Sequence, residues 1–125
     1  MSSSKYVWGE LADVCEILRQ LMYEDRDLAK AKMQLPKLEA LLEQLPDNDV
    51  AIIRAEGFAL LHELKEEPEQ AIEYRKREIE LMEMLHQHIR DNDYDDKTKQ
   101  SLLNGRDTED LELRKTIILA LEERL

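Results

Sequence analysis

The sequence has little of what strands, disulfides and phosphate-binding loops require: one cysteine, three glycines, and aromatic residues at 5%. A single cysteine, Cys15, excludes an intrachain disulfide and a cysteine-based metal site. Three isolated glycines exclude a phosphate-cradling loop, and the scarcity of glycine and aromatic residues favours helix over sheet. No apolar run reaches the roughly 18 residues of a membrane span, and no signal peptide is evident. We therefore expect an all-α cytoplasmic protein with no membrane partner.

Charge of one sign dominates what is present. Charged residues form 38% of the chain, and the net charge is −11. Phosphate binding needs clustered Lys and Arg, so we expect no nucleic-acid partner. Acidic clusters, such as the one over residues 91–96, can attract a basic protein partner or simply keep a small helical protein in solution.

Apolar residues recur at three- and four-residue spacings, the pattern of amphipathic helices. We expect the first helix to begin after Ser3 or Ser4, either of which can cap it, and a turn at residues 24–27. A second helical stretch over residues 28–45 contains Pro36, which predicts a kink, a break or the start of a new helix there.

Capping residues predict the later helices. Asp47, Asn48 and Asp49 are alternative caps for a third helix. Pro68 fits the first turn of a fourth, which continues for about 22 residues to Ile89. A short helix over residues 97–103 should end at Asn104 and Gly105. Asp107 or Thr108 then caps the last helix.

The expected helix starts near Ser4, Asp47 and Asp91 lie about 43 to 44 residues apart. Each interval holds one pair of helices, the third pair being shorter. The sequence therefore predicts a single domain over residues 1–125, an all-α right-handed stack of about three antiparallel helical hairpins. Their approximate ranges are 4–46, 47–90 and 91–125.

The segment 45–89 resembles a tetratricopeptide repeat. Residues 45–48 (Leu-Pro-Asp-Asn) are similar to the proline-containing junction between two repeats, and residues 71–74 (Ala-Ile-Glu-Tyr) to the start of the second helix. Gly57 and Ala59 suit the small residues of the first helix, which let the second helix approach closely. The resemblance implies a tetratricopeptide-like superhelix that binds a protein or peptide.

Three features depart from the family. The spacing is about 43 residues where a regular repeat has about 34, so the helices are lengthened. Arg75 and Glu78 stand where the family prefers an aromatic and a small residue.

Partner-binding residues are predicted on the third helix. In tetratricopeptide arrays the first helix of each pair lines the concave groove. Arg54, Phe58 and His62 follow one another at four-residue spacing and share one helix face. They offer a cation, an aromatic ring and a switchable donor to a peptide. The alternative is that Phe58 is core and the other two are solvated surface.

No motif predicts catalysis, a cofactor or a metal site. Asp91, Asp93 and Asp95 alternate like calcium ligands, but Asp96 replaces the glycine that the loop requires. His86 and His88 project from different helix faces, and we expect His86 to be a hydrogen-bonded interior residue. Cys15 lies on an apolar face and is expected to pack there.

We therefore expect no enzyme but an interaction module or adaptor, which binds a peptide or helix of a protein partner. The acidic clusters suit a basic partner. The alternative is a small acidic inhibitor, of the immunity or nucleic-acid-mimic type, that blocks a basic toxin or nuclease. The wide apolar faces of the first and last helices also allow a homo-oligomer to form through the terminal hairpins.

Overall fold

A computed structural model describes residues 4–125, and in that range the chain forms helices and loops without a strand. The predicted all-α fold is confirmed. In chain order the elements are α1 (Ser4–Arg19), the π-helical turn η1 (Gln20–Glu24), α2 (Leu28–Lys32), α3 (Leu35–Gln44), α4 (Ile52–Leu64), α5 (Pro68–Asp91), α6 (Asp96–Leu103) and α7 (Thr108–Glu122).

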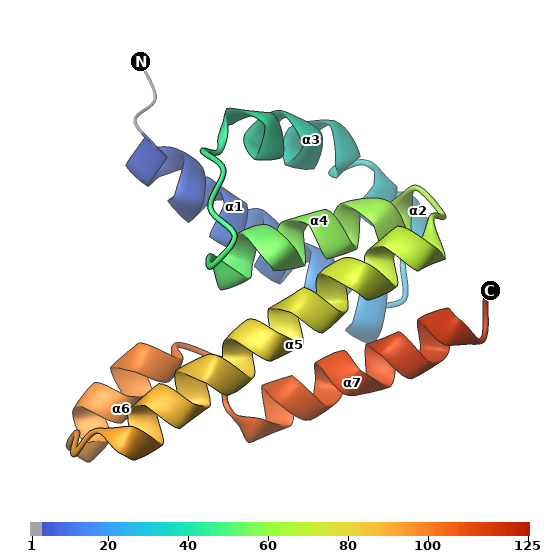
Figure 1. The fold of residues 1–125 in the computed structure, drawn as a ribbon. Helices are drawn as coiled ribbons and strands as arrows, with labels where there is room; N and C mark the ends of the chain where they lie inside the picture. Colours follow the sequence, from blue (N-terminus) through green and yellow to red (C-terminus); the bar gives the residue numbers. More distant parts are fainter. Residues whose placement is uncertain (1–3) are drawn as a thin grey trace.

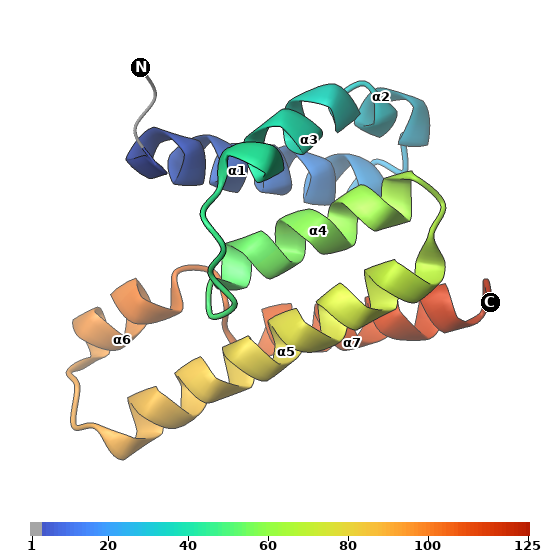
Figure 2. The same ribbon diagram turned by 45° about the horizontal axis from the view of Figure 1, so that its top comes forward.

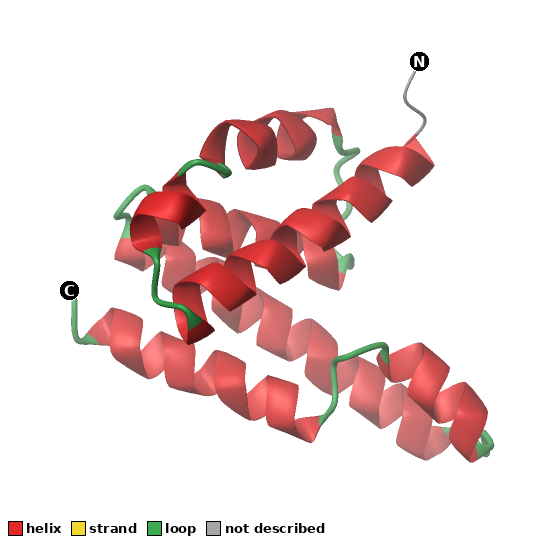
Figure 3. Cartoon of the chain, turned by 180° about the vertical axis from the view of Figure 1, so that it is seen from behind, coloured by secondary structure: helices red, strands yellow, loops and turns green. Residues whose placement is uncertain are grey.

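The α4–α5 hairpin is the centre of the molecule (Figures 1 and 2). The helix α1 packs against α3 and α4, and α7 packs against α5. The short α6 lies beside the far end of α5. Seen from behind, α1 and α7 lie on the same side of the hairpin, with α4 and α5 beyond them (Figure 3).

The apolar core consists of two clusters. The larger one joins α1, η1, α2, α3 and α4, and the smaller one joins α5 and α7. Tyr23 of η1 packs against both. The apolar rows predicted for the first and last helices supply much of this core, among them Leu11, Leu18, Leu111, Ile117 and Leu121.

Several helix ends follow the local chemistry of the sequence. Pro36 and Pro68 occupy the first turns of α3 and α5, as expected of a residue without an amide hydrogen. Asn104 takes the left-handed conformation with φ 44° after α6. Asp107 caps α7 through a reciprocal capping box with Asp110.

The start of α4 differs from the prediction. We expected a cap at Asp47, Asn48 or Asp49, but α4 begins at Ile52 without a side-chain cap. The Asn48 side chain instead accepts a hydrogen bond from the Val50 amide at 3.1 Å. This local turn competes with the helix for the backbone donor, so the helix starts later.

Two further predictions concern the start of α1 and the neighbours of Gly57. Ser3 lies outside the described residues, and Ser4 is already the first residue of α1. A Cβ atom on Gly57 would lie 2.9 Å from Leu42 and 3.2 Å from Leu11. The closest neighbours of this glycine thus belong to α3 and α1, not to the second helix of its own hairpin. The absence of a side chain at Gly57 therefore lets α1 and α3 pack closely against α4.

Candidate functional site

The three predicted partner-binding residues do share one face of α4, and α5 covers that face. Tyr74 of α5 stacks on Phe58 with ring centroids 5.0 Å apart, and on His62 at 5.5 Å. The Arg54 guanidinium lies 4.8 Å from the centre of the Phe58 ring. Together these side chains form a ladder across the α4–α5 hairpin.

The polar ends of this ladder pair within the chain. Arg54 lies 3.4 Å from Asp47 and 3.8 Å from Asp49, and its side chain is 21% exposed. His62 Nδ1 is 2.9 Å from a Glu67 oxygen. These contacts give the three residues a role within the hairpin, while contact with a peptide stays a prediction.

Other residues weighed from the sequence also have structural partners. His86 is half-buried, and its Nε2 lies 2.6 Å from the Arg106 carbonyl oxygen. Asp95 caps α6 through the Thr98 amide. Burial raises the pKa of the Cys15 thiol, which is fully enclosed by the core and therefore uncharged. Within residues 4–125, no group of three or more His, Cys, Asp and Glu side chains could hold a metal ion.

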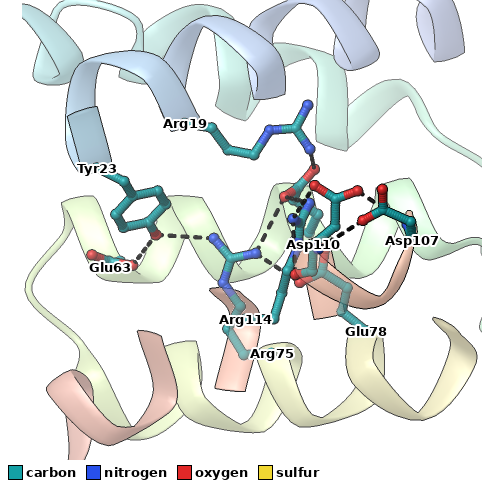
Figure 4. Close-up of polar contacts among 9 residues, drawn as sticks. Arg19, Tyr23, Glu63, Arg75, Glu78, Asp107, Asp110 and Arg114 are labelled. Carbon is teal, nitrogen blue, oxygen red and sulfur yellow. Dashed lines mark hydrogen bonds and ion pairs between the residues drawn. The ribbon is translucent and has the colours of Figure 1, made fainter. Parts of the chain in front are cut away.

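A network of buried charges joins α4, α5 and α7 (Figure 4). Its central members are Glu56 on α4, Arg75 and Glu78 on α5, and Arg114 on α7, none more than 2% exposed. Each arginine pairs with both glutamates, so that the buried charges compensate one another. The nitrogen–oxygen distances are 3.2 Å for Arg75–Glu56, 2.6 Å for Arg75–Glu78, 2.9 Å for Arg114–Glu56 and 3.2 Å for Arg114–Glu78.

Three more side chains extend this network towards α1 and the surface. Arg19 of α1 donates to Glu56 Oε1 at 3.0 Å. Arg75 donates to the Tyr23 hydroxyl at 2.9 Å, and that hydroxyl donates to Glu63 at 2.6 Å. The network therefore connects the helices of both apolar clusters.

The two buried glutamates have opposite pKa shifts. Burial by itself would raise the pKa of Glu56, but the three neighbouring arginines hold it below its ordinary value. Burial, together with the negative charge of Glu56, outweighs the two arginines beside Glu78 and raises its pKa. Burial also raises the pKa of Tyr23, so its hydroxyl keeps the proton that it donates.

This network was not predicted from the sequence, although the sequence contains signals for it. Arg75 lies three residues after Ile72 and four before Ile79, both buried, and Arg114 has the same relation to Leu111 and Ile118, with spacings of three and four. A charged residue that lies three or four residues from buried apolar ones indicates either that the apolar face of the helix is interrupted there or that the charge is buried in an ion pair. The two departures from the tetratricopeptide pattern, at Arg75 and Glu78, were members of the network.

Beside the network a groove runs between η1 and α7. Its apolar half has a volume of about 380 Å³. Met22, Tyr23 and Leu28 form one wall, and Leu113, Ile117 and Ala120 of α7 form the other. Leu28 is 55% exposed and Leu113 is 38% exposed, so apolar side chains face solvent here.

The polar half of the groove continues the apolar half. It has a volume of about 490 Å³ and shares Tyr23 and Leu113 with the apolar half. Arg19, Glu16 and Glu24 line it on the α1 side, and Asp110 and Arg114 on the α7 side. Because Arg19, Tyr23 and Arg114 also belong to the charge network, the buried charges position both walls of the groove.

No protein family, curated protein or solved structure gave a match to this chain. Within the described residues, no helix combines the length and apolarity needed to cross a bilayer. The groove presents the exposed apolar side chains of Leu28 and Leu113 to solvent, and we take it as the candidate functional site.

Proposed function

We propose that this protein is an interaction module that binds a segment of a protein partner in the groove between η1 and α7. The observation that carries the proposal is the exposure of Leu28 and Leu113 on facing walls of that groove. Exposed apolar side chains gathered in a concave surface are typical of protein-binding sites. The tetratricopeptide-like pairing of helices, α1 with α3 and α4 with α5, supports the same class of function.

Helical walls favour a helical segment as the bound form. Residues 4–125 contain no sheet edge, so the chain offers no backbone groups to which an extended peptide could add as a strand. An amphipathic helix needs only an apolar groove, into which side chains at i, i+3 or i+4 and i+7 insert. We therefore propose the helix-in-groove mode.

The proposal is tested by affinity capture with two variants of α7. Leu113→Asp places a charge in the groove, and Leu119→Asp places the same charge on another face of α7, where Leu119 is 64% exposed. We expect proteins retained by the wild type to be lost with Leu113→Asp and kept with Leu119→Asp. If both variants retain the same proteins, the groove is not the binding surface.

A further inference from the structure

The charged residues that line the apolar half of the groove have a net positive charge, opposite in sign to that of the whole chain. The whole chain has a net charge of −11, yet this half is lined by two arginines, Arg26 and Arg124, and by one carboxylate, Glu63. Glu63 accepts the hydrogen bond of the Tyr23 hydroxyl at 2.6 Å, so its charge is engaged at the wall of the groove. In this half of the groove the cations outnumber the anions.

Both arginines are available to a ligand. Arg26 and Arg124 are exposed, and neither forms an ion pair with a carboxylate in the described part of the chain. The carboxylates beside Arg26 have local partners, because Asp25 accepts from Gln20 and Asp27 caps α2 through Lys30. Arg26 also holds a left-handed backbone with φ 54°, an uncommon conformation for a residue with a side chain.

The polar half has the opposite balance. Glu16, Glu24 and Asp110 line it, against Arg19 and the buried Arg114, whose guanidiniums already pair with Glu56. A ligand that lies along the whole groove therefore meets cations at one end and carboxylates at the other.

Resting on the proposed function, we infer that the groove binds an amphipathic helix whose aliphatic stripe is flanked by Asp or Glu at the end that lies between Arg26 and Arg124. This occupant differs from the basic partner that the overall charge suggests. The α7 wall has 15 residues, about 22 Å, so a bound helix of four turns fits its length. Charges at the rim chiefly set specificity and orientation, and the aliphatic side chains supply the contact area.

A displayed library of random peptides of roughly 16 residues, matched to the length of α7, tests this inference. The full chain is the bait, and peptides that also bind Leu113→Asp are removed. We expect the enriched peptides to carry aliphatic residues at helical spacing, with Asp or Glu concentrated at one end. Enrichment of basic amphipathic peptides would overturn the inference and leave the groove function intact. If no peptide remains after this removal step, because every binder of the wild type also binds Leu113→Asp, both proposals are wrong.

A charge-reversal pair then measures the role of the two arginines. One enriched peptide is titrated against the double variant Arg26→Glu/Arg124→Glu and against the control Lys37→Glu/Lys97→Glu. The control changes the net charge equally at exposed positions that line no part of the groove. We expect about 5- to 30-fold weaker binding for the groove variant, as for two exposed ion pairs, and less than about twofold for the control. Equal affinities for the two variants would show that the arginines do not select the ligand.

Discussion

The residues that decide most about this structure are the two buried glutamates and two buried arginines between the apolar clusters. An isolated buried charge is strongly unfavourable, and a buried pair offsets that cost only when its hydrogen bonds are well made. Here Glu56 accepts from three arginines. Arg75 Nε is buried and donates to no atom within residues 4–125, so one donor of the network is unsatisfied. The network has little tolerance for the loss of a partner.

Glu56→Gln tests this reasoning at neutral pH. The substitution keeps the shape of the side chain but leaves three arginines with less buried negative charge, so we expect the free energy of unfolding to fall by about 3–5 kcal/mol. Chemical denaturation measures it. Glu63→Gln, which replaces the charged acceptor of the Tyr23 hydroxyl by a neutral one, is the control and should cost about 1 kcal/mol. Equal costs for the two variants would contradict the central position of Glu56.

The opposite pKa shifts of the glutamates predict opposite dependence on pH. Because the folded state lowers the pKa of Glu56, its ionisation stabilises the fold above its ordinary value of 4.5, and this contribution is lost as the pH falls through the lower folded value. Because the folded state raises the pKa of Glu78, ionisation of that group costs stability as the pH rises from 4.5 through the higher folded value.

Denaturation of three proteins across acidic and neutral pH checks these signs. Glu56→Gln should lose its deficit relative to wild type as the pH falls below about 4.5. Glu78→Gln should gain stability relative to wild type as the pH rises above that value. A difference from wild type that is independent of pH for both variants would show that neither carboxyl has a shifted pKa.

Among the elements, α4 is the one whose packing depends most on a small residue. Gly57 lets α4 approach Leu42 of α3 and Leu11 of α1, and a Cβ there would already be at 2.9 Å. Gly57→Leu should lower the free energy of unfolding by about 1–3 kcal/mol, because the larger side chain overpacks the contact between the helices. Gly9→Leu, in α1 with open space around it, is the matched control and should raise it by about 0.5–1 kcal/mol through helix propensity. If Gly57→Leu is as stable as Gly9→Leu, the close approach does not limit the packing.

The elements that sequence could predict are those fixed by neighbouring residues. Pro68, Asn104 and Asp107 determine helix ends through their own backbone or side chain, so their positions follow from local chemistry. The predicted start of α4 was wrong, because the Asn48 side chain accepts a hydrogen bond from the nearby Val50 amide instead of capping the helix. The charge network could not be assembled from sequence, since Glu56 and Arg114 are 58 residues apart. The groove likewise brings together η1 and α7, which are far apart in the sequence, and no local pattern predicts it.

The whole molecule is unevenly packed, and its local stability should differ accordingly. The helix α6 buries no residue and packs against α5, whereas α4 lies between α1, α3 and α5. We expect the α6 amides to exchange with deuterium through local opening, far faster than those of α4. Hydrogen exchange followed by mass spectrometry or NMR measures both. Equal protection of the two helices would mean that α6 opens only with the whole fold.

The proposal for the whole molecule is that the groove between η1 and α7 holds a protein partner, with both walls fixed by the buried charges. The most direct measurement places a photoreactive phenylalanine analogue at Leu113, inside the groove, or at Leu119, on another face of the same helix. After irradiation in the source cells, we expect the probe at position 113 to form a specific crosslink to a partner protein and the probe at 119 to form none. The same crosslinked proteins from both positions, or a partner captured only from 119, would contradict it.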